Sequence, residues 1–312
     1  MTKREEFLLR RMSGIGGSDI GAICGVSPWK SPLDVYYDKT SEPESIINQE
    51  AFPVGETKSL YWGAVHEAAV ADAYSLVSGV KLMRYNRLIT HPEKPYFIAN
   101  VDRLAYRADG SRPFNTKTGE IFTDTGIEIK TARFKDDEWG EEGTDDVPAQ
   151  YFLQCQWYMG LIPSIKRFIL VVLFGGNDMK VYCIERDQQI IDKIQEIGDK
   201  FWNENVLQRV PPPPRTYEEV KALYPGAAIV KMTASAELEA DIRQLAELTA
   251  KRKYAEQLEA DQKFKVAEAM AECEMAVGVD GTPLATFKEG KRGRLLSVKV
   301  KSEGDMEELK NA

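Results

Sequence analysis

The sequence predicts a mixed α/β domain followed by a mainly helical extension, and three observations support this fold class. Extended segments alternate with helical segments along the chain up to a run of four prolines, 211–214. The proline run breaks the chain, as a stiff polyproline spacer would. Beyond it, residues 236–276 are dominated by Ala, Glu, Lys and Leu, which favour helices. We therefore expect two domains, at residues 1–210 and 211–312.

Several of the helices expected in the first domain have a recognisable start signal. Ser18 lies near the end of a glycine-rich segment, 14–19, where its side chain could cap the next helix. Ser31 and Pro32 supply a cap and a first helical residue. Asp187 can cap a long amphipathic helix. In chain order, helices are expected at residues 3–11, after Ser18, after Ser31, at 60–77, at 149–161 and after Asp187.

Extended segments fill the intervals between these helices. Strands are expected at residues 81–90, 96–106, 120–131, 167–174 and 180–185. The last two flank Gly175-Gly176-Asn177-Asp178 and therefore suit a hairpin. In the second domain, residues 236–276 suit either one helix or a helical hairpin, and glycines near 281 and 290–293 indicate a terminal β-hairpin. Whether that domain clamps DNA, contacts another subunit or recruits a protein stays open.

The composition excludes several classes of protein. The chain has no apolar run of about 18 residues and no apolar signal core after its charged N-terminus. We therefore expect a cytoplasmic protein without a membrane span. The four cysteines lie far apart with no Cys-x-x-Cys pair, and there are two histidines, which excludes a zinc site or an iron–sulfur cluster of the usual spacing.

The net charge of −8 is unusual for a protein that binds nucleic acid, because phosphate binding normally needs a basic surface. The charge is unevenly distributed along the chain, however. Basic residues concentrate at 10–11, 130–135 and 288–301, whereas acidic residues crowd 136–146 and 237–274. This distribution keeps nucleic acid open as a partner.

Asp102 and the run Ile127-Glu128-Ile129-Lys130 carry the clearest chemical signal. Side chains alternate along a strand, so Glu128 and Lys130 share one face while the isoleucines share the other. A carboxylate can hold Mg²⁺ and an ammonium beside it can position a water, which is what phosphodiester hydrolysis requires. Charged pairs of this kind also decorate exposed strand edges. The isoleucines indicate a buried strand instead, where charges need a partner or a metal.

Several segments together resemble the YqaJ-type, lambda-exonuclease-like branch of the PD-(D/E)XK nuclease superfamily. They occur in the family's order across about residues 5–185 and comprise Arg11 with Gly14-Ile15-Gly16-Gly17-Ser18-Asp19-Ile20, Ser27-Pro28-Trp29-Lys30-Ser31-Pro32, Trp62-Gly63 with Glu67, Asp102, Glu128-Ile129-Lys130-Thr131, and Ala149-Gln150-Tyr151-Phe152-Leu153-Gln154-Cys155-Gln156-Trp157-Tyr158. The resemblance implies a restriction-endonuclease-like core, in which a central mixed β-sheet is flanked by helices. The long interval between Asp102 and Glu128 departs from the pattern and predicts an extended hairpin at residues 107–124.

The resemblance implies a metal site built on the acidic residues. Asp102 and Glu128 resemble the principal Mg²⁺ ligands, for which Mn²⁺ would substitute, with the backbone carbonyl of Ile129 as a third ligand. Glu67 is similar to the helix-borne acidic residue that completes the site, although an exposed helix position is the alternative. Lys130 would orient or activate the attacking water and stabilise the charge that develops on the phosphate.

Two further pairs of residues match elements of the family. Gln154 and Tyr158 fit its Gln-x-x-x-Tyr element, and their spacing puts both on one helical face. There they could hydrogen-bond the metal-bound water, a carboxylate ligand or the DNA backbone, or simply satisfy each other. Arg11 and Ser18 resemble the pocket for the terminal 5′-phosphate, because a guanidinium binds phosphate in a bidentate manner and a hydroxyl adds a donor.

Two residues outside this set have open roles. His66 has no second histidine nearby in the sequence, so a packed or exposed helix residue fits it better than a catalytic base. Trp29 could stack against DNA or pack inside the protein.

The resemblance implies a phage-type, Mg²⁺-dependent exonuclease that digests one strand of linear double-stranded DNA from its end in the 5′-to-3′ direction. It further implies a partner, a single-strand annealing protein, and a ring-shaped homotrimer. A ring could present the basic residues of a net acidic chain inward. Two alternatives remain: an endonuclease of the same superfamily, and a noncatalytic DNA-binding or scaffold module on a nuclease fold.

Overall fold

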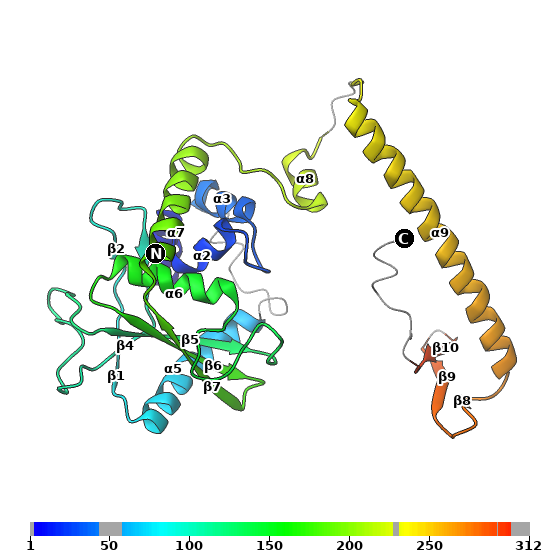
Figure 1. Cartoon of the computed structure of the whole chain (residues 1–312), viewed down its shortest axis with the longest axis horizontal. Coiled ribbons are helices and arrows are strands. Elements are labelled where there is room, and N and C mark those ends of the chain that lie inside the picture. Colours follow the sequence, from blue (N-terminus) through cyan, green and yellow to red (C-terminus); the bar gives the residue numbers. More distant parts are fainter. Residues whose placement is uncertain (1–2, 44–57, 227–230, 292, 301–312) are drawn as a thin grey trace. The chain divides into compact units, whose positions relative to one another are not determined.

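The computed structural model describes residues 3–43, 58–226, 231–291 and 293–300. It divides the chain into two compact units, residues 1–226 and 227–312, called here the first and second unit (Figure 1). The proline run at 211–214 lies inside the first unit, and the division falls after Gly226.

Five strands of the first unit form a mixed sheet in the order β1-β4-β5-β6-β7 (Figure 1). β5 and β6 are parallel, whereas the other neighbouring pairs are antiparallel. The strands are β1 (Leu82–Arg84), β4 (Arg103–Ala105), β5 (Thr125–Ala132), β6 (Arg167–Phe174) and β7 (Asp178–Glu185). A separate two-stranded sheet pairs β2 (Ile89–Thr90) with β3 (Ile98–Ala99).

Helices cover both faces of the five-stranded sheet. On one face, α5 (Lys58–Ser78) packs its Val70 and Tyr74 against Ile127 and Ile129 of β5. On the other face lies α6 (Ala149–Leu161), which is the crossover between the parallel strands. α2 (Gly17–Ile23) and α7 (Gln188–Lys200) pack against α6. The predicted mixed α/β fold with a central mixed sheet flanked by helices is therefore confirmed.

The remaining elements of the first unit differ in detail from the expected ones. The extended segments 81–90 and 96–106 each split into two short strands, so that Asp102 lies in the loop between β3 and β4. The extended hairpin expected at residues 107–124 is reduced to one antiparallel bridge between Phe114 and Ile121, and turns make up most of the segment. The other helices are α1 (Lys3–Met12), α3 (Pro32–Thr40), a π-helical turn (Phe201–Val206) that continues α7, and α8 (Tyr217–Leu223).

The glycine-rich segment starts α2 in a different way from the expected one. Gly16 is the capping residue, and its N–H donates to Oδ2 of Asp19 at 3.0 Å. Ser18 lies inside the first turn, so its expected role as the cap is wrong. Asp19, three residues after the cap, instead supplies the reciprocal half of a capping box, because its carboxylate accepts the N–H of the capping residue.

In the second unit, residues Ala236–Met270 form one unbroken helix, α9, which settles the choice between a helix and a helical hairpin. It is followed by a three-stranded antiparallel sheet of β8 (Met275–Val277), β9 (Pro283–Gly290) and β10 (Gly293–Val298). The guanidinium of Arg294 lies over the ring of Phe287 and donates to the carbonyls of Ala271, Cys273 and Phe287. One member of the basic cluster 288–301 therefore ties the end of α9 to the sheet.

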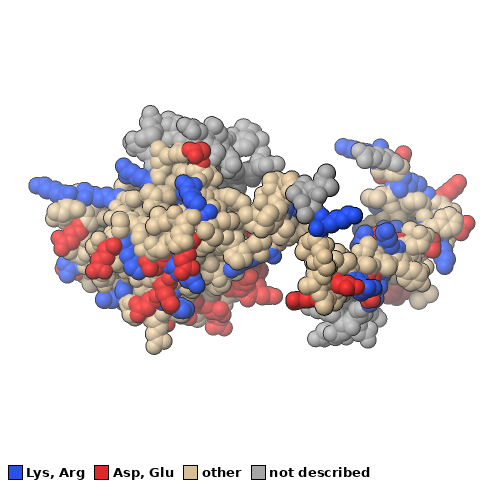
Figure 2. Space-filling view, turned by 90° about the horizontal axis from the view of Figure 1, so that it is seen from above, with Lys and Arg blue, Asp and Glu red and all other residues tan. Residues whose placement is uncertain are grey.

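Surface charge is mixed on the face of the first unit that Figure 2 shows. In Figure 2, acidic and basic side chains are interspersed over the larger unit on the visible face, without one continuous basic surface. None of the helices in the described part of the chain is long and apolar enough to cross a membrane.

Candidate active site

β5 places Glu128 and Lys130 on the face of the sheet that α6 covers, as strand alternation predicts. Lys130 Nζ lies 2.6 Å from Glu128 Oε1. Nε2 of Gln154, on α6, donates to the same oxygen at 2.6 Å and to the Tyr158 hydroxyl at 2.8 Å. Lys130 Nζ also lies 5.4 Å from the centre of the Tyr151 ring. The structure thus brings together Glu128, Lys130, Gln154 and Tyr158.

Asp102 reaches this group from the loop between β3 and β4. Its Oδ2 accepts the backbone N–H of Ile129 at 2.9 Å, which fixes the carboxylate beside β5. Burial, together with the neighbouring charge of Glu128, raises the pKa of Asp102 to about 8. Asp102, Glu128 and Lys130 are together called the carboxylate–lysine cluster.

The carboxylate–lysine cluster holds charge in a buried place. Burial raises the pKa of Glu128, partly offset by Lys130 and Gln154. Burial alone would lower the pKa of Lys130, but the two carboxylates outweigh it and the net shift is upward. Lys130 therefore stays protonated. The raised pKa values of the two carboxyl groups show that a further positive charge beside them would be favourable.

One oxygen of Glu128 is available to bind a cation. Oε1 receives both Lys130 and Gln154, whereas Oε2 is buried and has no hydrogen-bond partner. A buried polar atom without a partner is rare and needs an explanation. Carboxylate oxygens are also the ligands that Mg²⁺ prefers. The donor set of Asp102 and Glu128 therefore fits a hard divalent cation.

Glu67 is paired with two arginines rather than with the carboxylate–lysine cluster. Its Oε1 lies 2.6 Å from the guanidinium of Arg103 and 3.6 Å from that of Arg84. Its charge still helps to raise the pKa of both Asp102 and Glu128, so it lies within electrostatic reach of them. Among the described residues, no three His, Cys, Asp or Glu side chains converge as a metal cage would require. Both ion pairs use Oε1 of Glu67, so contact of its other carboxylate oxygen with a cation would not require them to break.

Arg11 and Ser18 lie together, as the resemblance implies. A guanidinium nitrogen of Arg11 donates to Ser18 Oγ at 3.4 Å and lies 3.8 Å from Asp19 Oδ1. Lys39 Nζ donates to Asp19 Oδ2 and to the backbone carbonyl of Arg11, both at 2.7 Å. Burial raises the pKa of Asp19, but Lys39 and Arg11 outweigh it and lower it to about 2. These four residues are called the arginine–serine cluster.

The sequence did not single out the two residues that hold Arg11 and Ser18 in place. Asp19 had a usable signal, because it stands three residues after the capping glycine. Lys39 had none, since a lysine on an amphipathic helix is ordinarily exposed. Here the side chain of Lys39 is 2% exposed. Trp29, whose role was open, is 79% exposed and does not belong to the core.

The fold and these clusters define a mixed-sheet α/β protein with a buried carboxylate–lysine centre on a core strand. Residues 6–161, half of the chain, match the model of the YqaJ-like viral recombinase domain. The chain therefore belongs to this family, and the resemblance to YqaJ-type proteins is confirmed. The matched region contains the eight side chains expected at the site, namely Arg11, Ser18, Glu67, Asp102, Glu128, Lys130, Gln154 and Tyr158.

Individual proteins of known sequence or structure are also similar to the chain. The uncharacterized protein YqaJ of Bacillus subtilis (strain 168) is 34% identical over 208 residues, which are 65% of this chain and 57% of that protein. The alkaline exonuclease LHK-Exo of Laribacter hongkongensis is 16% identical, with a TM-score of 0.43 over 71% of this chain and 100% of that one. A phage related exonuclease of Haemophilus somnus 129PT is 15% identical, with a TM-score of 0.39 over 63% and 96% of the two chains.

Proposed function

We propose that the chain is a metal-dependent deoxyribonuclease that digests one strand of linear double-stranded DNA from its end. The observation that carries this proposal is the carboxylate–lysine cluster, in which a buried oxygen of Glu128 lacks a partner beside a lysine cation. Membership of a viral recombinase family supports DNA as the substrate. The mixed surface charge is compatible with DNA only if binding is confined to local sites.

Asp102 and Glu128 would hold Mg²⁺, or Mn²⁺ in its place, with the backbone carbonyl of Ile129 and with Glu67 as further ligands. The cation would polarise the scissile phosphate and lower the pKa of an attacking water. Lys130 would donate to the phosphate oxygens as negative charge develops on them. Its upward-shifted pKa keeps it charged at neutral pH, so it acts as a hydrogen-bond donor rather than as a base.

Gln154 and Tyr158 would act by orienting Glu128. The amide of Gln154 donates to Oε1, which leaves Oε2 as the oxygen available to a cation. Burial raises the pKa of Tyr158 well above its ordinary value, so its hydroxyl stays neutral. A neutral hydrogen-bonded pair can fix a carboxylate without adding a competing charge.

The arginine–serine cluster would bind the 5′-terminal phosphate. Arg11 and Ser18 both offer hydrogen-bond donors. Asp19 lies beside the Arg11 guanidinium and is itself paired with Lys39, so it helps to hold Arg11 in position. Binding a terminal phosphate there would set the direction of digestion as 5′ to 3′. Cooperation with a single-strand annealing protein, a ring-shaped trimer and action in the host cytoplasm belong to the same proposal.

A comparison of three DNA substrates tests the proposed function. The substrates are a 5′-phosphorylated linear duplex, the same duplex with a 5′-hydroxyl, and a covalently closed circle, each with Mg²⁺ and with chelator. We expect rapid digestion of the first, slower digestion of the second, and none of the circle or of any substrate with chelator. Nicking of the circle would favour the endonuclease alternative. Binding without hydrolysis of any substrate would favour the noncatalytic module.

A further inference from the structure

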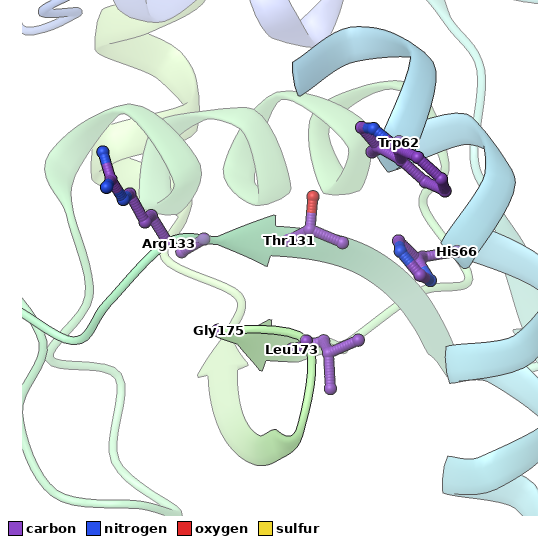
Figure 3. Close-up of a pocket in the computed structure, with 8 residues that line it drawn as sticks. Trp62, His66, Thr131, Arg133, Leu173 and Gly175 are labelled. Carbon is purple, nitrogen blue, oxygen red and sulfur yellow. The ribbon is translucent and has the colours of Figure 1, made fainter. Parts of the chain in front are cut away.

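A pocket of about 310 Å³ opens between α5, the end of β5 and the turn that joins β6 to β7. Figure 3 shows Trp62 and His66 projecting from α5 on one side of Thr131, and Arg133 extending from the end of β5 on the other side. Leu173 and Gly175 complete the labelled lining. The volume lies at the lower end of the range for small-ligand sites, about 300–1,000 Å³.

The aromatic wall of the pocket is already assembled. Trp62 and His66 lie one helical turn apart, and their rings stack with centroids 5.6 Å apart at 25°. Tyr61 meets the Trp62 ring edge-on at 5.4 Å. The Trp62 side chain is nevertheless 51% exposed. A large aromatic ring that is held by neighbours and still half exposed offers a surface on which another flat ring can stack.

Arg133 lines the other side of the pocket, and its side chain extends outward from the end of β5 (Figure 3). Arg133 is exposed, and within the described ranges of the chain no hydrogen bond or ion pair engages its guanidinium. Gly175 and Gly176 have φ of 58° and 82°, so this turn is built from residues without side chains and leaves the rim clear. The lining contains no aspartate or glutamate. The pocket therefore combines an aromatic surface with an arginine, in a lining that has no acidic side chain.

Two elements that line the pocket, α5 and β5, also carry residues of the proposed active site. Thr131 follows Lys130 on β5, and His66 precedes Glu67 on α5. Thr131 occupies the strand face toward α5, whereas Glu128 and Lys130 occupy the face toward α6. A flexible strand would therefore have to cross the end of β5 to contact both the pocket and the cluster.

We infer that this pocket binds one nucleotide of a DNA strand, with the base stacked on Trp62 and a phosphate held by Arg133. The inference rests on the proposed function for the identity of the strand, which would be the one being cut. Stacking is tolerant of sequence, because every base has a π-face. The pocket would therefore hold the strand near the cluster without selecting a base.

Binding of a fluorescein-labelled single-stranded oligothymidine to the full chain, measured by anisotropy in chelator, tests the inference. Trp62→Ala should raise Kd about tenfold, the size expected for the loss of one base–aromatic stack. Trp62→Phe retains a π-face and should bind more tightly than Trp62→Ala. Tyr217→Ala is the matched control, because this aromatic side chain is 75% exposed in the same unit but lies on α8, outside the pocket.

Arg133→Ala supplies an independent readout. Loss of one phosphate contact should lower the slope of log K against log salt by about 0.7 for a single strand. A merely structural role would leave that slope unchanged. Melting temperatures equal to that of the parent would confirm that each variant is folded.

The binding assay and the hydrolysis assay can reject the two proposals independently of each other. Equal Kd for Trp62→Ala and the parent, or no binding by the parent, would overturn the inference. A parent that binds the oligonucleotide but hydrolyses no duplex would overturn the proposed function and leave the nucleotide pocket standing. If both hold, Trp62→Ala should raise KM for linear duplex about tenfold with little change in kcat, because stacking contributes binding in the ground state.

Discussion

Gly17 of α2 lies directly against the ring of Tyr158 of α6: a Cβ atom on Gly17 would stand 2.5 Å from Cε1 of that ring. Gly17 precedes Ser18 of the arginine–serine cluster, and Tyr158 contacts Gln154, which holds Glu128. The close approach of the two helices therefore connects the site proposed for the DNA end and the site proposed for cleavage through directly packed residues.

Gly17→Ala should destabilise the fold. The added methyl group would force α2 and α6 apart, and overpacking of this kind costs about 1–3 kcal/mol in free energy of unfolding. Urea denaturation measures the change. Gly226→Ala is the control, because a Cβ there meets nothing within 4 Å. Equal stability of Gly17→Ala and the parent would show that the helices can separate freely.

Asp19 should make stability depend on pH in the acid range. Its pKa is about 2 in the folded protein against an ordinary 3.8, because Lys39 and Arg11 outweigh the effect of burial. The depressed pKa means that its contribution is present above about pH 4 and is lost as the pH falls toward 2. The shift corresponds to about 2 kcal/mol.

Asp19→Asn isolates this contribution. The variant should be less stable than the parent at about pH 5, because Lys39 keeps a buried charge without its partner. The difference in free energy of unfolding should shrink by about 2 kcal/mol between pH 5 and pH 2. Asp72→Asn, at an exposed position of α5, should show no such convergence. A constant difference for Asp19→Asn would contradict the assignment.

Mg²⁺ affinity should rise with pH. The pKa of Asp102 is about 8 without a metal, because of burial and the charge of Glu128. A proton must leave this carboxyl before it binds a cation, so affinity should rise about tenfold per pH unit below 8 and level off above it. Titration calorimetry at several pH values measures this, and Glu128→Gln should remove the binding. Affinity that does not change with pH would argue against Asp102 as a ligand.

Arg11→Ala should abolish the preference for a 5′-phosphate. The variant should digest 5′-phosphorylated and 5′-hydroxyl linear duplexes at the same reduced rate, because the charge-assisted contact to the terminal phosphate is gone. Arg209→Ala is a suitable control, since this arginine donates instead to the carbonyl of Thr40. A variant that still prefers the phosphorylated end would place the phosphate site elsewhere.

Strand periodicity predicted the placement of Glu128 and Lys130 correctly, because alternation is a local property of β5. The approach of Asp102 to Ile129 is not local: it needs a loop between β3 and β4 and the antiparallel pairing of β4 with β5. Periodicity contains no information on such pairing, and only the order of family motifs suggested it.

Other features of the site depend on tertiary packing that the sequence does not encode locally. Lys39 is buried because α3 places it beside Asp19 of α2. Glu67 pairs with Arg103, a residue that follows Asp102 directly and carried no signal of its own. The stack of His66 on Trp62 follows from helical spacing, but their joint position over the end of β5 depends on how α5 packs on the sheet.

The release of acid-soluble nucleotides from a 5′-phosphorylated linear duplex, by the parent and by Lys130→Ala, tests the central proposal most directly. With Mg²⁺ the parent should release nucleotides from one strand, and Lys130→Ala should be slower by about 100-fold or more, as expected when a donor to developing charge is removed. Chelator should stop the parent, and Lys193→Ala, at an exposed position of α7, should match it. Equal rates for Lys130→Ala and the parent, or release that continues in chelator, would contradict a metal-dependent centre at Asp102, Glu128 and Lys130.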